Sequence, residues 1–428
     1  MGPSDRRSYG AGVPNPVRVS GAGSTSTTAS IARITTPAAA RARLNELTVG
    51  EKARLLVMGY GDTRTAPWSG SVIVNQTHLT ATGTPQLAKA VEVAASRTGA
   101  TVLVAADQEG GKVNRLKNVP GYGAVSFPSP QKMRSMTPEQ LRAEGAKVGK
   151  ALRAAGVNTL LGPVLDAAAP GTLMANQGRS FGATPAEVLA RAQPFIDGLR
   201  AENPNVVLLA KHFPGYDVRG NSDISHVEDR STLEELRAKA APFLQMKGLD
   251  GVMVSSISYP NVDGQPACFS PKIIGLLREA NPGALVITDD IAAGGLLSAR
   301  AAAFKSYEIA ASRPDAASKA EAQALVARYP DFATSQGRAA MRASIHEEIK
   351  ANAKKAFLAG CDVVLTMDNR EAPAVADAIA ELVNERPDLK PRLDQAASRM
   401  LQASINATPG SEAVATTTPA TPRGWTPS

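Results

Sequence analysis

The chain has 428 residues, of which 43% are hydrophobic and 20% charged, as is ordinary for a globular protein of one large barrel or two to three average domains. No run reaches the roughly 20 apolar residues of a membrane-spanning helix, so we expect no membrane span. The formal net charge is +8, but six arginines against one aspartate in residues 1–43 supply most of it, and the nearly neutral remainder gives little reason to expect a nucleic-acid partner.

Both ends of the chain have a composition typical of disorder. Residues 1–40 mix Gly, Ser, Thr, Ala and Pro without periodicity, and residues 407–428 are rich in Thr, Pro and Ala. We therefore expect a disordered basic tail, a folded domain over residues 41–406 and a second disordered tail. Because the amino terminus lacks the apolar core of a secretory signal, we expect a cytoplasmic protein, or an exported one if a leader has been removed.

Eight short apolar runs predict strands. They are residues 55–60, 71–75, 101–107, 159–166, 206–212, 251–256, 284–290 and 362–368. Continuous Val/Ile/Leu runs are typical of parallel strands that are buried on both faces. In a closed barrel the carboxyl ends of such strands meet at one rim, where barrels keep their chemistry. The polar residues brought there would be Asp107, Asp166, Lys211, His212, Ser256, Asp289 and Asp368, and this convergence indicates an enzyme.

Helical patterns alternate with these runs, and the alternation predicts an α/β fold, a (β/α)8 TIM-like barrel. The clearest helices are residues 84–97, 137–155, 185–202, 232–246, 271–280, 372–384 and 391–405. Several begin with Thr or Pro followed by Glu or Gln, as helix starts commonly do.

Two irregularities interrupt the regular barrel. Only residues 61–70 separate the first two strands, which is short for a helical crossover, so we expect an irregular first unit whose strands are antiparallel or otherwise distorted. About 70 residues lie between Ile291 and Asp362. They predict a helical insertion before the last strand, with its centre at 299–350, that serves as a lid over the rim, a dimer contact or a spacer.

The two cysteines, Cys268 and Cys361, have no spacing suited to a metal site. We expect two buried thiols, with a disulfide as the alternative.

Four segments carry residues suited to chemistry. In residues 107–115 paired glycines allow a sharp turn, so that Asp107 and Arg115 point into one pocket, although an acidic residue before Gly-Gly is also a common loop. Arg179 is a planar donor for a polar ligand, or else part of a surface salt bridge.

The other two segments are 211–226 and 286–291. A Lys-His pair at a strand end is unusual because both groups need partners when buried. The loop that follows has a His near carboxylates and is suited to proton transfer, although a solvated acidic loop is the alternative. Asp289 would lie at the barrel mouth as a nucleophile, a metal ligand or a helix cap.

The ordered set of motifs resembles glycoside hydrolase family 3. The motifs are Asp-Gln-Glu-Gly-Gly at 107–111, Arg-Ser-Phe-Gly at 179–182, Lys-His-Phe-Pro-Gly at 211–215, the Tyr-Pro to Phe-Ser segment at 259–270, Thr-Asp-Asp at 288–290 and Ala-Gly-Cys-Asp-Val-Val-Leu at 359–365. The similarity spans about residues 45–405. Within the family the chain is most similar to the short, single-barrel β-N-acetylglucosaminidases.

The resemblance implies roles for individual residues. Asp289 matches the nucleophile of the family. The positions that match those holding sugar hydroxyls and the 2-acetamido group are Asp107, Arg115, Arg179, Lys211 and His212. It implies a carbohydrate substrate, no cofactor and no metal, and it leaves the oligomeric state open.

The chain departs from the family pattern at the proton donor. The short enzymes carry Asp-Ser-His after the Lys-His-Phe-Pro-Gly motif, with His as acid/base, whereas residues 216–226 are longer and differ in register. Either Asp223 takes the place of that His, or Asp223 and His226 form a stretched dyad. Ser256 also stands where the family usually has His.

The function that these features imply is that of a retaining glycoside hydrolase. It would remove non-reducing terminal β-linked sugars, above all N-acetylglucosamine from cell-wall-derived glycans, through a covalent glycosyl-Asp289 intermediate. The alternatives are a catalytically impaired glycan-binding barrel and a family 3 hydrolase with another β-sugar specificity.

Overall fold

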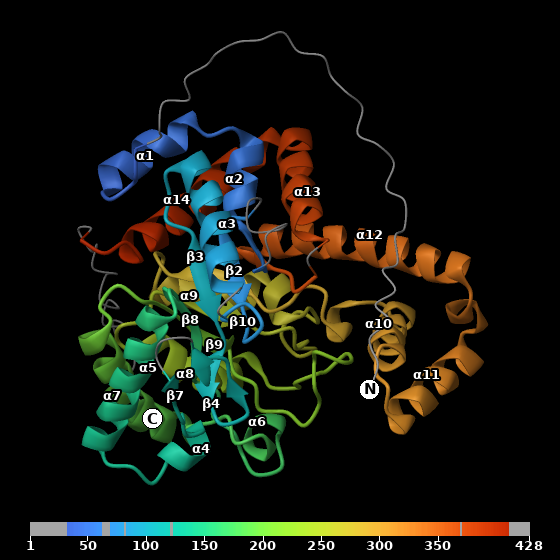
Figure 1. Cartoon of the computed structure of the whole chain (residues 1–428), viewed down its shortest axis with the longest axis horizontal. Coiled ribbons are helices and arrows are strands. Elements are labelled where there is room, and N and C mark those ends of the chain that lie inside the picture. Colours follow the sequence, from blue (N-terminus) through green and yellow to red (C-terminus); the bar gives the residue numbers. More distant parts are fainter. Residues whose placement is uncertain (1–31, 62–68, 81–82, 120–122, 369, 411–428) are drawn as a thin grey trace, which may run out of the picture.

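The computed structural model describes residues 32–61, 69–80, 83–119, 123–368 and 370–410 (Figure 1). The parts of the predicted tails at residues 1–31 and 411–428 lie outside the described residues. Two helices, α1 (Pro37–Glu46) and α2 (Val49–Leu55), precede the first strand.

Eight parallel strands form one sheet in the order β11-β10-β9-β8-β3-β2-β1-β12. They are β1 (Val57–Tyr60), β2 (Ser71–Val74), β3 (Leu103–Ala106), β8 (Thr159–Val164), β9 (Val207–Phe213), β10 (Gly251–Val254), β11 (Leu285–Thr288) and β12 (Val364–Leu365). An isolated parallel bridge between Ile287 and Val363 brings the last two strands together, so that the sheet nearly closes into a barrel. The predicted barrel is confirmed, and each of its strands lies within one of the eight apolar runs or extends one residue beyond it.

The first two strands correct one expectation. β1 and β2 pair in parallel, with Met58 opposite Ser71, so the antiparallel alternative is wrong. Ten residues suffice for a parallel return, because ten extended residues reach roughly 33 Å, whereas a four-residue strand is only about 13 Å long.

Helices flank the barrel strands, and four short strands lie outside the barrel sheet. Of the helices, α3 (Gly83–Thr98), α5 (Pro138–Ala154), α7 (Pro185–Glu202), α8 (Leu233–Gln245), α9 (Pro271–Ala280), α13 (Ala372–Glu385) and α14 (Lys390–Asn406) confirm the seven predicted ones, and α4 (Pro130–Met133), α6 (Leu173–Asn176) and the 3₁₀ helices η2 (Ala267–Phe269) and η5 (Pro387–Leu389) are further short turns. The remaining strands, β4 (Gln108–Gly110), β5 (Val113–Asn114), β6 (Asn118–Val119) and β7 (Gly123–Ala124), form two small hairpins. Capping boxes at Thr137, Thr184 and Thr232 start α5, α7 and α8, which explains why these starts were readable in the sequence.

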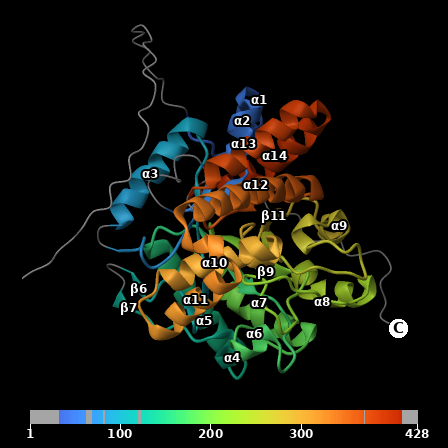
Figure 2. The same cartoon turned by 90° about the vertical axis from the view of Figure 1, so that its right-hand side faces the viewer.

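The insertion before the last barrel strand is helical, as predicted. It consists of η3 (Gly294–Leu296), α10 (Ala299–Ala311), α11 (Ala316–Arg328), η4 (Pro330–Ala333) and the long α12 (Ser335–Ala359). Helices α10 and α11 project from the barrel as a lobe (Figure 1) and lie in front of its strands when the molecule is turned (Figure 2). The lobe has its own aromatic contacts, in which Phe332 packs on Phe304, Tyr307 and Tyr329.

Both cysteines are buried and free, and the Cys361 thiol donates to the carbonyl of Cys268 at 3.4 Å. The disulfide alternative is therefore wrong. In the part of the chain that the structure describes, no helix is both long and apolar enough to cross a membrane.

Candidate active site

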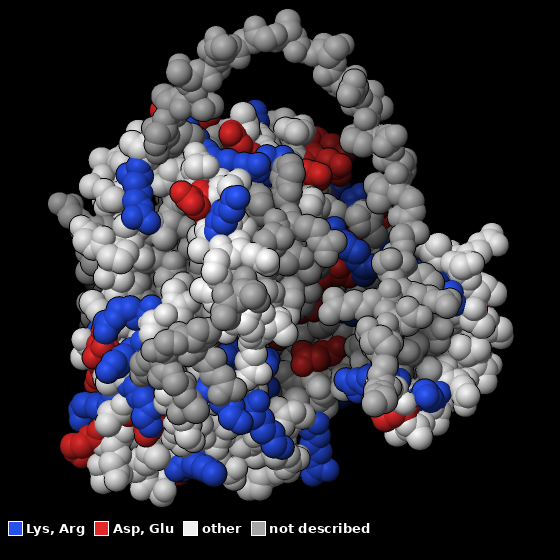
Figure 3. Space-filling model, in the orientation of Figure 1, with Lys and Arg blue, Asp and Glu red and all other residues white. Residues whose placement is uncertain are grey.

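A cavity of about 370 Å³ opens at the carboxyl ends of the barrel strands, beside α10. Its polar lining includes Asp107, Glu109, Arg115, Gln177, Arg179, Lys211, His212, Tyr216, Asn221, Asp223, Asp289, Asp290 and Lys305. In the space-filling view, acidic side chains lie deep in a hollow between the barrel and the α10–α11 lobe (Figure 3). All five residues expected to hold the sugar line this one cavity.

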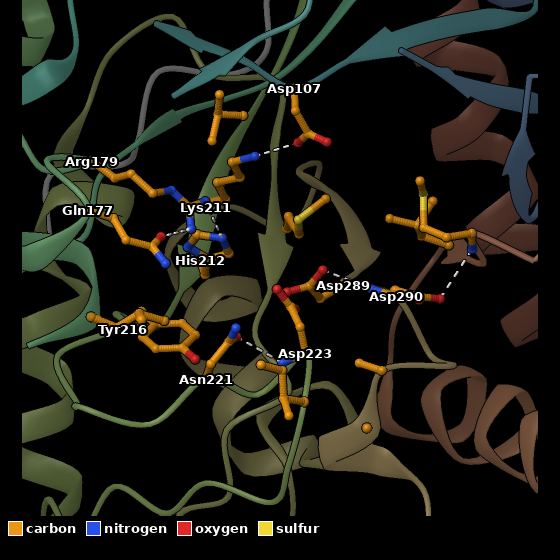
Figure 4. A pocket seen from close by; sticks show the side chains of 18 of the residues that line it. Asp107, Gln177, Arg179, Lys211, His212, Tyr216, Asn221, Asp223, Asp289 and Asp290 are labelled. Carbon is orange, nitrogen blue, oxygen red and sulfur yellow. Dashed lines mark hydrogen bonds and ion pairs between the residues drawn. The ribbon is translucent and has the colours of Figure 1, made fainter. Parts of the chain in front are cut away.

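A network of alternating charges occupies one wall (Figure 4). The Lys211 ammonium contacts Asp107 at 2.5 Å and Glu109 at 2.8 Å. Arg179 donates two hydrogen bonds to Glu109, at 2.7 and 2.8 Å, in a bidentate pair. Burial opposes ionisation of Glu109, but the Lys211 and Arg179 charges prevail and lower its pKa to about 2.

The two carboxylates that Lys211 contacts keep it charged. Burial alone would lower its pKa, but the charges of Asp107 and Glu109 raise that pKa above its usual value. Arg179 is therefore not in a surface salt bridge, because its partner Glu109 is buried. The wall presents fixed cationic donors to the cavity.

His212 is oriented by a buried carboxylate. Its Nδ1 lies 2.7 Å from Oδ2 of Asp166, whose Oδ1 accepts the backbone N–H groups of His212 and Tyr216 at 3.0 and 2.8 Å. Asp166 thus fixes the imidazole, and the His212 Nε2 lies 3.4 Å from Arg179. The pair at 211–212 therefore has partners for both groups, which answers the burial problem that the sequence raised.

The two aspartates after β11 differ in how their oxygens are used. The Asp290 carboxylate accepts the backbone N–H groups of Ala292 and Met367 at 3.1 and 3.2 Å, so it ties two segments together. Asp289 accepts the N–H of Asp290 on Oδ1 at 2.8 Å, and among the described residues no hydrogen bond reaches its Oδ2. Asp289 therefore has an oxygen left for a substrate.

The environment of Asp289 perturbs its ionisation. Enclosure by protein and then the neighbouring charge of Asp223 raise the pKa of Asp289 to about 6, against the opposing charges of His212 and Lys211. A carboxylate whose pKa is raised by a second carboxylate in the same cavity is a common arrangement at catalytic sites.

The loop after β9 places Asp223 at the cavity and is held from two sides. The Tyr216 hydroxyl accepts the N–H of Ser222 at 2.8 Å. From the segment after Asp289, Gly295 donates to the carbonyl of Ser222 and Gly294 to that of Asp223, each at 2.9 Å. The loop therefore rests on the chain that follows Asp289.

His226 lies away from the cavity. It is not among the lining residues, its side chain is 58% exposed, and its nearest acidic partner is Glu228 at 3.7 Å. The structure thus brings together Asp223 and Asp289 but leaves His226 outside.

Three residues expected at the rim, Asp166, Ser256 and Asp368, are absent from the lining. Asp166 orients His212, the buried hydroxyl of Ser256 has no hydrogen-bond partner within the part of the chain that the structure describes, and Asp368 pairs with Arg370 at 2.7 Å. Conversely, sequence reasoning missed Glu109. The signal was present, because residues two apart in an extended segment share a face, so Glu109 accompanies Asp107.

Among the described residues, no group of three or more His, Cys, Asp or Glu side chains is arranged to hold a metal ion.

Comparison with known proteins gives three related results. Residues 67–308 match the Glycosyl hydrolase family 3 N terminal domain. The chain is 27% identical to a β-hexosaminidase of Idiomarina loihiensis over 327 residues, which cover 74% of this chain and 82% of that protein. It is 34% identical to a β-hexosaminidase of Methylococcus capsulatus over 204 residues, or 45% of this chain and 59% of that protein.

The fold is similar to that of solved structures. A β-N-acetylhexosaminidase from Beutenbergia cavernae superimposes with a TM-score of 0.63 at 27% identity, over 84% of this chain and 98% of that one. A glycosyl hydrolase of family GH3 from Mycobacterium smegmatis does so with a TM-score of 0.62 at 25% identity, over the same shares.

Proposed function

This chain belongs to glycosyl hydrolase family 3, and from that premise we propose how its cavity cleaves a glycosidic bond. The chain is a glycosidase that removes terminal N-acetylglucosamine, as its β-hexosaminidase relatives indicate. These relatives favour an enzyme over the glycan-binding alternative. We propose further that the sugar comes from cell-wall-derived glycans.

Asp289 is the nucleophile. Its free Oδ2 attacks the anomeric carbon and forms a glycosyl ester, while the bond from that carbon to the glycosidic oxygen breaks. The observation that carries this assignment is that Asp289 lines the cavity with an oxygen, Oδ2, that no hydrogen bond from the described residues reaches, whereas Oδ1 of Asp290 ties the segments of Ala292 and Met367 together.

Asp223 is the proton donor. It lines the same cavity as Asp289, and its charge raises the pKa of Asp289, whereas His226 lies outside the lining. Protonated Asp223 gives its proton to the leaving oxygen. In the second half it takes a proton from water, which attacks the anomeric carbon and releases the sugar and free Asp289.

The charged wall holds the sugar. Lys211 and Arg179 keep donors directed at the cavity, and Asp107 and Glu109 accept from hydroxyls as well as from these cations. Fixed donors and acceptors strengthen binding as positive charge develops on the ring in the transition state.

Trapping the intermediate tests these assignments. In an Asp223→Asn variant, an aryl β-N-acetylglucosaminide that needs no acid would form the glycosyl-enzyme quickly, while hydrolysis without a base would be slow. Mass spectrometry of the quenched reaction is expected to find one added sugar on the peptide that contains Asp289. A sugar on another residue, or none although product is released in a burst, would reject this mechanism.

A further inference from the structure

The mouth of the cavity has an unusual concentration of exposed apolar side chains. Among the described residues, the exposed large hydrophobic side chains are Val93, Ile224, Leu233, Ile309, Leu358 and Met367. Three of the six, Ile224, Ile309 and Met367, line the cavity that holds Asp289. Single exposed apolar residues are ordinary, but a group around one opening marks a contact surface.

The three side chains come from separate parts of the chain. Ile224 is in the loop after β9 and is 61% exposed, Ile309 is in α10 and is 51% exposed, and Met367 follows β12 and is 38% exposed. Each of these segments is anchored, α10 through the Lys305 ammonium, which donates to the carbonyl of Ala292. The loop is bound through Gly294 and Gly295, and the N–H of Met367 donates to Asp290. The apolar surface is therefore assembled by the fold.

The cavity thus has a charged part and an apolar part. Its depth carries the buried charges of Glu109, Lys211 and His212, which suit sugar hydroxyls, and its opening carries aliphatic carbon. A substrate that fits both parts is polar at one end and has apolar surface at the other.

The position of Ile224 indicates which part of the substrate meets the apolar opening. Ile224 directly follows Asp223 in the chain. A proton donor must come within about 2.6–3.2 Å of the glycosidic oxygen. The leaving group is attached to that same oxygen, so it must pass beside the residues that flank Asp223.

We propose that Ile224, Ile309 and Met367, here called the aglycone collar, bind apolar surface on the leaving group of the substrate. This inference rests on the proposed function, and it narrows the substrate class to β-N-acetylglucosaminides whose aglycone carries an alkyl or acyl substituent close to the glycosidic bond. A leaving group that is hydroxylated on all sides would leave the collar in contact with water and gain nothing from it.

A series of simple alkyl glycosides tests the collar on the whole chain. Methyl, butyl and hexyl β-N-acetylglucosaminides have leaving groups of similar acidity, so differences in kcat/KM report contact with the alkyl chain. A fully buried methylene is worth about fourfold in binding, and we expect a rise of about two- to fourfold for each of the first few methylenes.

Two variants locate the effect. Ile309→Ser removes a collar side chain that comes from α10 and not from the segments that carry Asp223 or Asp289. We expect the hexyl-to-methyl ratio of kcat/KM to fall at least roughly threefold, about one methylene's worth of contact. Leu358→Ser is the matched control, because Leu358 is 44% exposed in the same insertion but does not line the cavity. That control should retain both the ratio and the rates.

The outcomes separate this inference from the function on which it rests. Hydrolysis of every glycoside at the same rate regardless of chain length would overturn the collar and leave the glycosidase intact. A chain-length gain that Ile309→Ser does not reduce would also overturn it. If no β-N-acetylglucosaminide of any length is hydrolysed, the proposed function fails and the collar fails with it.

Discussion

Two buried carboxylates, Asp362 and Asp289, lie at opposite ends of the barrel and differ in the number of contacts that their oxygens make. At the amino ends of the strands, Asp362 accepts from three arginines, with its closest contact to Arg278 at 2.5 Å, and also from the N–H of Val286 at 3.0 Å. At the carboxyl ends, Asp289 accepts a single backbone N–H. A carboxylate whose oxygens are all used holds a structure together, whereas one with an oxygen unused can react.

A similar difference separates two carboxylates near β9 and β10. Asp250 at the start of β10 accepts from Arg200, the N–H of Leu208 and Asn406. At the other end of β9, Asp223 has an acidic neighbour in Asp289, whose pKa it raises. The number of contacts thus distinguishes Asp250 and Asp362 from Asp289, whereas Asp166 and Glu109 at the carboxyl ends of the strands are also fully paired.

The largest expected effect comes from removing the carboxylate of Asp289. Asp289→Asn should lower kcat by roughly 10⁴–10⁶-fold, as loss of a nucleophile does in other enzymes. Because the raised pKa means that the folded protein binds this proton more tightly, its stabilising contribution is lost as pH rises through about 6. The variant should therefore melt at the same or a higher temperature at pH 7.5, and a large fall in Tm would place Asp289 among the structural carboxylates.

The next prediction concerns Asp362, at the amino ends of the strands. Asp362→Asn breaks a buried ion cluster and should lower the free energy of unfolding by roughly 3–5 kcal/mol, while kcat per folded molecule stays the same. Denaturant unfolding and active-site titration measure the two quantities. Asp388→Asn is the control, since its pair with Arg386 is exposed and should add little to stability. Equal stability losses in both variants would erase the distinction between Asp362 and Asp289.

The strands and the helix starts were predictable from the sequence, because their signals are local. Continuous apolar runs identify buried parallel strands, and Thr137, Thr184 and Thr232 begin helices through contacts three residues away. Strand ends converge by geometry alone, so the shared cavity of Asp107, Lys211 and Asp289 followed from the barrel prediction.

The proton donor was not predictable in the same way. Which residue of the 216–229 loop faces the cavity depends on hydrogen bonds from Gly294 and Gly295, about seventy residues further along. The spacing of Asp223 and His226 in the sequence gives no information about these hydrogen bonds. For the same reason the sequence left the insertion as lid, dimer contact or spacer, whereas the structure shows α10 forming part of the cavity wall.

The Asp223→Asn variant tests which residue of the loop after β9 donates the proton. A general acid contributes about 10²–10⁴-fold, so kcat/KM for an alkyl glycoside should fall by that order, while an aryl glycoside with an acidic leaving group should lose far less. His226→Gln is the matched variant and should change neither substrate by more than about twofold. A large loss on the alkyl glycoside in His226→Gln would support the stretched dyad over Asp223 acting alone.

The smallest expected effect is a shift in pH dependence. For the aryl substrate, kcat/KM should fall as pH drops through about 6, because Asp289 then takes up a proton and loses its nucleophilic oxygen. Removing the charge of Asp223 leaves His212 and Lys211 as the nearby groups that lower this pKa. The acid limb of Asp223→Asn should therefore move to lower pH, as measured by initial rates between pH 4 and 8. An unmoved limb would mean that the two carboxylates do not sense each other, and Asp289 would then owe its raised pKa to enclosure alone.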